Sequence, residues 1–245
     1  MSKRFITNKN NINIEEQNIT LKGDELHHIN VLRHKIGDII YINEYQVEIT
    51  KLRKDILEGK IVGELPQNGI PRVNITLIQS YLKSDKMEYV VQKAVELGAK
   101  NIIPVISKNT VVKMEEKDKQ KKVERLSKIA KEAVEQCGRT DIVNVENVQH
   151  LSQLDLNVYD KILICHETSK VDLKTTLSNL KAINNIAILI GPEGGFENSE
   201  VAKVLENNNA IDVSLGERVL RAETASLAIL SILNYELNWI KEIYR

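Results

Sequence analysis

The sequence lacks the features that mark secreted, membrane-spanning and zinc-binding proteins. Its two cysteines, Cys137 and Cys165, lie far apart and form no Cys-x-x-Cys pair, which argues for a reducing compartment and against a zinc site. The first residues contain no apolar signal-peptide core, and the longest apolar runs have only the length of a strand. We therefore expect a cytoplasmic protein that spans no membrane and uses no metal.

Net charge is also absent, because 34 Lys and Arg residues balance 34 Asp and Glu residues. The charges are nevertheless unevenly placed: residues 73–140 carry 14 basic and 9 acidic side chains, and residues 141–245 carry 9 and 15. A basic middle and an acidic end allow a nucleic acid to contact local patches. Zero net charge therefore does not exclude an RNA-binding protein.

Three common motifs are missing from the places where the chain comes nearest to them. The glycine-rich stretch 191–197 lacks the Lys-Ser or Lys-Thr of a phosphate loop, and its glycines do not have GxGxxG spacing. His166-Glu167 is not followed by the second histidine of HExxH, because position 170 is Lys170. The sequence thus argues against a P-loop NTPase, a Rossmann dinucleotide-binding site and a zinc metalloprotease.

What the sequence does contain is a strand, a loop and a helix, repeated twice between residues 186 and 239. The apolar run 186–190 predicts a buried strand that ends at Gly191-Pro192, and Asn198-Ser199 can cap a helix reaching about residue 207. A second apolar run, 211–215, ends at Gly216, and Thr224 begins a predicted helix over 225–239. In an open α/β sheet such loops lie at one edge, so we expect both to face one ligand pocket.

The two loops carry a family resemblance. The first reads Gly191-Pro192-Glu193-Gly194-Gly195, and the second reads Leu215-Gly216-Glu217-Arg218-Val219-Leu220-Arg221-Ala222-Glu223-Thr224-Ala225. This ordered pair resembles the signature of the SPOUT methyltransferases, and in particular the RsmE family of 16S ribosomal RNA uridine N3-methyltransferases. The resemblance implies S-adenosylmethionine as methyl donor, a homodimer, and an α/β domain with a C-terminal trefoil knot, which general topology rules would exclude.

The resemblance also implies which residues contact the donor. Backbone groups of both loops would read the adenine edges, and His166 follows a predicted strand over 161–165 that adjoins the same pocket. A hydrogen-bonded turn histidine explains His166 equally well. The candidate cofactor-binding residues are His166, Leu189, Gly191, Pro192, Glu193, Gly194, Gly195, Leu215, Gly216, Leu220, Thr224 and Ala225.

The sequence divides near the proline-containing stretch 65–71. Residues 1–70 are β-rich, with predicted strands at 19–21, 38–42, 47–52 and 56–63 and one helix over 24–33. Residues 71–245 alternate strands (75–78, 102–106) with helices (84–97, and helical spacing within 113–131). The family resemblance implies that the first domain is a PUA-like RNA-binding β-barrel and the second the SPOUT methyltransferase domain.

RNA contacts are predicted from basic and histidine side chains that can reach phosphate oxygens. Most lie in stretches that resemble the RsmE family, including 27–38, 83–98 and 131–139. The basic run 113–131, with eight basic and four acidic side chains, is either a second RNA-binding face or an ordinary solvated helix face. The candidates are Arg4, His27, Arg33, Lys83, Lys86 and Arg139.

The implied chemistry requires the imide proton of uridine N3 to leave, which spreads negative charge onto O2 and O4. Arg221 is the candidate that stabilises this charge, because its guanidinium stays protonated and offers a fork of donors. Glu193 and Glu223 are the candidate bases, although Glu223 also suits the start of a helix for electrostatic reasons alone. Arg4 or Arg139 would help to orient the RNA.

Three functions are compatible with these patterns. The first is N3 methylation of a uridine in the decoding region of 16S rRNA, on free RNA or on the small ribosomal subunit. The second is methylation of another base or of a ribose 2'-hydroxyl by a related SPOUT enzyme. The third is a non-catalytic RNA-binding assembly factor, which would not need the glycines together with Arg221 and Glu223.

Overall fold

The computed structural model describes residues 4–23, 26, 29, 34–65, 71–83, 85–180 and 183–239 of the 245-residue chain. It comprises two compact units: residues 1–70 with 134–142, and residues 71–133 with 143–245. The boundary between residues 70 and 71 coincides with the proline-containing stretch 65–71. Residues 134–142 join the first unit through long-range bonds, since Arg4 donates to the Gly138 carbonyl and the Ile6 N–H donates to Glu135 Oε1 at 3.2 Å.

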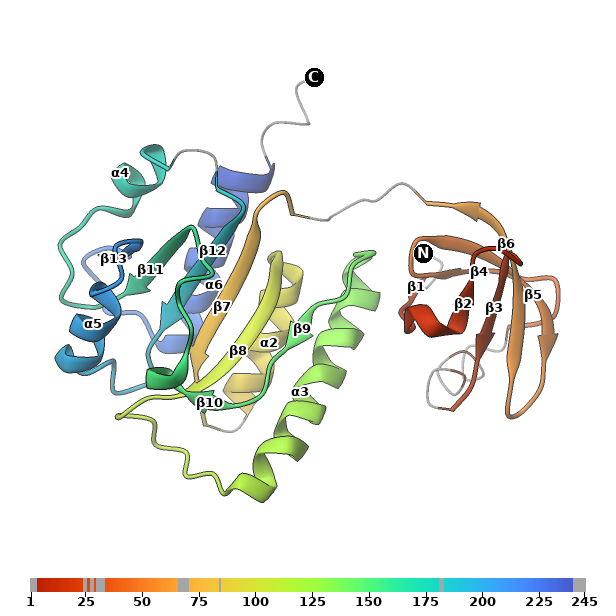
Figure 1. Ribbon diagram of the computed structural model, residues 1–245, viewed down its shortest axis with the longest axis horizontal. Helices are drawn as coiled ribbons and strands as arrows, with labels where there is room; N and C mark the ends of the chain where they lie inside the picture. The colour runs from red at the N-terminus through yellow and green to blue at the C-terminus, as the bar shows by residue number, and fades with distance from the viewer. Residues whose placement is uncertain are drawn as a thin grey trace. The chain divides into compact units, whose positions relative to one another are not determined.

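The N-terminal unit is built on a six-stranded sheet in the order β1-β4-β5-β6-β3-β2 (Figure 1). Neighbouring strands are antiparallel except for β1 and β4, which are parallel. Buried and exposed residues alternate along the strands, so the sheet has one apolar face. The elements are β1 (Arg4–Phe5), η1 (Lys9–Asn11), β2 (Ile12–Asn13), β3 (Asn18–Leu21), β4 (Ile39–Ile42), β5 (Tyr45–Leu52) and β6 (Leu57–Glu64).

The four predicted strands of this unit are confirmed as β3 to β6, whereas the two-residue strands β1 and β2 were not predicted. From the predicted helix over 24–33 the structure describes only Leu26 and Ile29, both helical and buried in the core of this unit. The candidate RNA contacts His27 and Arg33 lie outside the described residues.

The second unit contains a parallel sheet in the order β10-β8-β7-β12-β11-β13, with β9 also paired to β8. Its strands are β7 (Asn74–Ser80), β8 (Ala99–Ile106), β9 (Asn144–Val145), β10 (Gln149–His150), β11 (Lys161–Cys165), β12 (Asn185–Ile190) and β13 (Ala210–Val213). Its helices are α2 (Asp85–Glu96), α3 (Glu116–Cys137, whose last four residues belong to the first unit), η2 (Leu151–Gln153), α4 (Leu173–Ser178), α5 (Asn198–Leu205), α6 (Ala222–Leu233) and the π-helical turn η3 (Asn234–Trp239).

Strand β12 is apolar from Ile186 to Ile190 because both of its faces are covered. Ala187 and Leu189 belong to the cluster that includes Val201 and Val204 of α5. The alternate residues point to the opposite face, where α6 contacts β12 and packs along α2. An unbroken apolar run is the pattern expected of a parallel strand covered on both faces.

The predicted strands and helices of this unit are confirmed, but two helix starts and one helix end differ from the prediction. The last α-helix ends at Leu233, and residues 234–239 of the predicted helix form the π-helical turn η3. The helix after the first loop has Glu197, not Asn198, at its N-cap, where Glu200 Oε2 accepts from the Glu197 N–H at 3.1 Å. The last helix begins at Ala222 with Arg221 at its N-cap, before the predicted start at Thr224. The elements α4, β9 and β10 were not predicted from the sequence.

Candidate functional site

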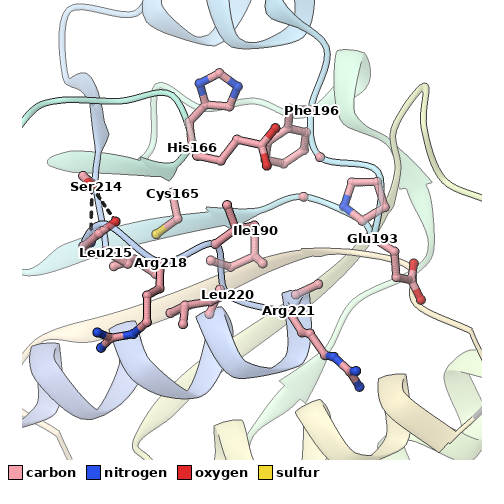
Figure 2. Close-up of a pocket in the computed structure, with 18 of the residues that line it drawn as sticks. Cys165, His166, Ile190, Glu193, Phe196, Ser214, Leu215, Arg218, Leu220 and Arg221 are labelled. Atoms are coloured by element: carbon pink, nitrogen blue, oxygen red, sulfur yellow. Dashed lines mark hydrogen bonds between the residues drawn. The ribbon is translucent and has the colours of Figure 1, made fainter.

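The two glycine-containing loops meet in one pocket, as predicted from the sequence (Figure 2). They do so because β12, β11 and β13 are adjacent parallel strands whose ends are in register: Cys165 pairs with both Ile190 and Val213. The loops therefore leave the same edge of the sheet, which is where ligands bind in open α/β folds. The cavity has a volume of about 330 Å³, within the range of roughly 300–1,000 Å³ typical of small-molecule sites.

The first loop, residues 191–197, is held tightly against its own backbone. The Gly195 N–H donates to the Pro192 carbonyl at 2.9 Å, and Gly195 has a positive φ of 68°. A Cβ on Gly191 would lie 3.1 Å from the Phe196 nitrogen. From outside the loop, the Asn109 amide donates to the carbonyls of Gly194 and Gly195, each at 3.3 Å. The glycines are thus needed for a compact turn that presents backbone groups to the cavity.

Part of the pocket wall is apolar. Ile190 and Phe196 come from the first loop region, and Leu215 and Leu220 come from the second loop, residues 214–221 (Figure 2). Burial raises the pKa of the Cys165 thiol to about 12, so this side chain is a neutral part of the wall. Such a wall suits a flat heterocycle held by apolar contacts and main-chain hydrogen bonds.

The rim of the pocket carries opposed charges. Lys86 Nζ lies 3.2 Å from Glu223 Oε1 and 3.9 Å from Glu193 Oε1. Burial acts to raise the pKa of Glu223, but the residue's own backbone N–H, Lys86 and Arg221 outweigh it, so the net pKa is lowered. The second carboxylate oxygen, Glu223 Oε2, is buried and has no hydrogen-bond partner among the described residues.

Nine of the twelve candidate donor-binding residues line this pocket, and Arg221 lines it with them. Leu189 is instead buried within β12, while Gly194 and Thr224 are outside the lining. His166 lines the cavity and its Nδ1 also hydrogen-bonds Thr168 Oγ1 at 3.0 Å, so both interpretations of this histidine fit. The nine are His166, Gly191, Pro192, Glu193, Gly195, Leu215, Gly216, Leu220 and Ala225.

Several lining residues were not among the sequence candidates. Some of them lie inside the second quoted motif, and the others lie one position from a candidate or a quoted motif, so the sequence signal was present because all residues of a short loop share its edge of the sheet. They are Cys165, Glu167, Ile190, Phe196, Ser214, Glu217, Arg218, Val219 and Ala222.

Glu223 faces a second hollow next to the pocket, of about 690 Å³. Lys86 and Glu193 line both cavities, so the two adjoin. The lining of this second hollow, called the adjoining hollow below, is Lys83, Asp85, Lys86, Tyr89, Glu193 and Glu223. No sequence signal points to Tyr89, because a single aromatic residue on an exposed helix face has no motif around it.

The described RNA candidates differ in their availability to a ligand. Lys83 is exposed, and Lys86 is held by the two glutamates. Arg139 is only 4% exposed and forms a bidentate ion pair with Asp141, at 2.9 Å from Nε and 2.8 Å from Nη2. Arg4 donates to the Gly138 carbonyl within the same unit. Roles in RNA binding for these residues stay predictions.

Comparison with known proteins identifies the family. A family model described as an RNA methyltransferase domain matches residues 70–234. The chain is 32% identical over 240 residues to the ribosomal RNA small subunit methyltransferase E of Bacillus subtilis (strain 168), covering 93% of each protein. The chain belongs to the ribosomal RNA small subunit methyltransferase E family. The resemblance drawn from the two loops is thereby confirmed.

Solved structures agree with this family assignment. A ribosomal RNA small subunit methyltransferase E from Neisseria gonorrhoeae, bound to S-adenosyl methionine, is 28% identical with a TM-score of 0.81 and covers 96% of this chain and 98% of its own. A methyltransferase from Legionella pneumophila in complex with the same cofactor matches with the same identity, TM-score and coverage. The mixed α/β architecture therefore spans nearly the whole chain, as it does in these two proteins.

Two further observations concern other expectations. No helix among the described residues is both long and apolar enough to cross a membrane. Among the same residues, no three His, Cys, Asp or Glu side chains gather as a metal site would require. The expectation that no metal takes part stays a prediction.

Proposed function

We propose that this protein methylates N3 of a uridine in the decoding region of 16S rRNA, with S-adenosylmethionine as the methyl donor. The observation that carries the proposal is the convergence of the 191–197 and 214–221 loops on one pocket, which has apolar residues in its wall and a charged rim. Family membership and the donor-bound structures of two relatives support it. The substrate is the RNA itself or the small ribosomal subunit that contains it.

The residues present fit this donor. Ile190, Phe196, Leu215 and Leu220 offer an apolar wall to adenine, and the glycines bring main-chain groups close to it. Glu193 at the rim can complement the positive sulfonium of the bound donor, which supplies an electrophilic methyl group. Alignment in a pocket shielded from water is the main requirement of an in-line displacement.

The protein's own part in the reaction is to remove a proton and to stabilise charge. The N3–H proton passes to a carboxylate, the freed electron pair on N3 forms the new N–CH₃ bond, and the electrons of the broken S–CH₃ bond remain on sulfur. Arg221, which extends from the second loop in Figure 2, stabilises the charge on O2 and O4 as the proton leaves.

Glu193 and Glu223 are the proton acceptors that we propose, and their roles differ. The lowered pKa of Glu223 keeps it ionised, which favours hydrogen-bond acceptance over retention of a proton. Glu193 is more exposed, pairs less closely with Lys86, and can exchange a proton with water. Glu223 would therefore orient the imide N–H, and Glu193 would carry the proton away.

Finer features of the fold belong to the same proposal. We infer a PUA-like barrel in the N-terminal unit and a trefoil knot around the pocket; β12 follows β11 in sequence yet lies between β11 and β7. We also infer a homodimer that uses α6. Leu230 and Leu233 are fully buried within the chain, so an interface would use the exposed side of this helix, where Ile232 is 39% exposed.

The decisive experiment supplies labelled S-adenosylmethionine to small ribosomal subunits that lack the modification and maps the labelled nucleoside. Label at uridine N3 is the expected result. Label on another base or on a ribose would place the chain among other SPOUT activities. Retention of RNA without any label would indicate a non-catalytic assembly factor, and either outcome would overturn the proposal.

A further inference from the structure

The adjoining hollow has a composition unlike that of the donor pocket. Its lining consists of two lysines, three acidic residues and one aromatic ring, and it shares Lys86 and Glu193 with the donor pocket. A molecule in the hollow would therefore lie next to whatever fills the pocket. The hollow is formed entirely within the second unit.

Tyr89 supplies the apolar surface in this lining. It lies on α2, four residues after Asp85 and three after Lys86, so the three side chains share one helix face. Tyr89 is 46% exposed, although large aromatic side chains usually bury most of their surface. An exposed ring among charged groups is the arrangement that proteins use to stack an unpaired nucleobase.

Beside the Tyr89 ring, the hydrogen-bond donor of Lys86 lies next to an unpaired acceptor oxygen of Glu223. Lys86 Nζ is 3.2 Å from Glu223 Oε1, and Glu223 Oε2 is buried without a hydrogen-bond partner among the described residues. A buried oxygen without a hydrogen-bond partner destabilises the protein, and a ligand that donates a hydrogen bond to it would remove this cost. Glu223 lines the hollow beside Lys86, so a turn of its carboxylate would bring the unpaired oxygen to an incoming N–H while Lys86 meets an incoming carbonyl.

This pattern complements the N3 edge of uracil. Uracil presents an N3–H donor flanked by two carbonyl acceptors, which complements a carboxylate oxygen next to a lysine. Cytosine presents an acceptor at N3, so it could satisfy the same pair only by donating from its N4 amino group to Glu223 and accepting from Lys86 at N3. The pair therefore places N3 against the carboxylate in uracil and against the lysine in cytosine.

We propose that the adjoining hollow holds the target uracil: the ring stacks on Tyr89, N3–H donates to the Glu223 carboxylate, and one flanking carbonyl accepts from Lys86. This inference rests on the proposed function and adds to it the residue that binds the base and the pair that orients it. Tyr89 touches the substrate but does not enter the chemistry.

The test compares Tyr89→Ala with two other variants on small ribosomal subunits that lack the modification. Stacking on one aromatic ring contributes about 1–3 kcal/mol per base, so Tyr89→Ala should lower kcat/KM at least about fivefold. Tyr89→Phe, which keeps the ring face, should recover most of the loss. The matched control is Gln92→Ala, an exposed position three residues further along α2 and outside both cavities.

The same preparations are titrated with S-adenosylmethionine by calorimetry, which separates base binding from donor binding. The expected result is an unchanged donor Kd in all three variants. Tyr89→Ala with the kcat/KM of Gln92→Ala would overturn the inference, as would equal loss in Tyr89→Phe, which would assign the effect to the hydroxyl. A parallel loss of donor affinity would make Tyr89 a structural residue and also overturn it.

These outcomes differ from a failure of the proposed function. If the wild-type protein labels no RNA, or labels a position other than uridine N3, the proposed function fails before any variant is compared. If the wild-type protein labels uridine N3 and Tyr89→Ala is unaffected, the proposed function stands and the base site lies elsewhere.

Discussion

The loop at 191–197 and the loop at 214–221 line one pocket but are held in place differently. The first is fixed from both sides, by its internal turn and by the two bonds from Asn109. In the second, Ser214 Oγ bonds the N–H and carbonyl of Gly216, and the following residues are exposed, with Val219 at 77%. The first loop is thus a preorganised wall, whereas the second presents its side chains outward.

This difference suggests that the two loops have separate functions. The fixed backbone of the first loop can bind the methyl donor, which is the same in every turnover. An exposed loop can meet a large RNA and place a charged group against it, as Arg221 would do. The following variants test whether this separation of functions is real.

The largest effect is expected from Arg221→Ala. Loss of one group that stabilises charge in a transition state typically lowers kcat roughly 100- to 1,000-fold. Donor affinity should stay near the wild-type value, because the wall that holds the donor is intact. Methyl transfer kinetics and calorimetry measure the two quantities.

Arg218→Ala is the matched control. Arg218 comes from the same loop as Arg221, but its side chain lies at the opposite side of the pocket view in Figure 2. It should lose far less activity. An equal loss of donor binding and kcat in Arg221→Ala would assign Arg221 to the donor site and remove the proposed division between the loops.

A smaller effect is expected from Gly216→Ala. Gly216 has a φ of 115°, and a Cβ added there would meet no atom within 4 Å, so alanine would add backbone strain and no clash. The strain is about 1–2 kcal/mol, and a loop that relaxes away from the pocket to relieve it would bind the donor roughly tenfold more weakly. Calorimetric titration of the donor measures this loss.

Gly37→Ala provides the control for strain alone. Gly37 has a φ of 91°, and a Cβ there would likewise meet no atom within 4 Å, but it lies in the N-terminal unit. The substitution should lower the free energy of unfolding by a similar amount and leave donor affinity unchanged. Equal donor affinity in both variants would show that the second loop does not shape the donor site.

The smallest expected effect concerns the pH dependence of stability. The folded protein lowers the pKa of Glu223 below its ordinary 4.5, so its ionisation stabilises the fold above that pH, and this contribution is lost as the pH falls through the lowered value. At pH 7 we expect Glu223→Gln to be less stable by at most about 1 kcal/mol, because the pair with Lys86 is partly exposed.

Urea unfolding of wild type and Glu223→Gln, in steps from about pH 7 to about pH 3, follows this difference. It should be constant down to about the ordinary pKa and then shrink. A difference that grows on acidification would mean that the pKa is raised, and Glu223 would then be the stronger candidate for the base.

Much of the site could be predicted because its signals are local. Gly191-Pro192 and Gly216 mark where two apolar runs end, and parallel strands place such ends at one edge. The helix starts were less accurate, since capping by Glu200 and the N-cap position of Arg221 depend on backbone geometry that residue preference alone does not determine.

The parts that could not be predicted depend on contacts between distant segments. The bond from the Ile6 N–H to Glu135, which helps to group residues 134–142 with the N-terminal unit, has no counterpart in a local pattern. Tyr89 reaches the rim only because α2 lies alongside α6, which brings Lys86 to Glu223. Sequence periodicity predicts such helices but not which two of them become neighbours.

The central claim is that both loops form one donor site, and calorimetric titration of S-adenosylmethionine into the wild-type protein and two loop variants tests it most directly. We expect saturable uptake at one site per chain, weakened by Gly191→Ala in the first loop and by Gly216→Ala in the second. Absence of uptake by the wild type, or uptake that is indifferent to a change in either loop, would contradict the account.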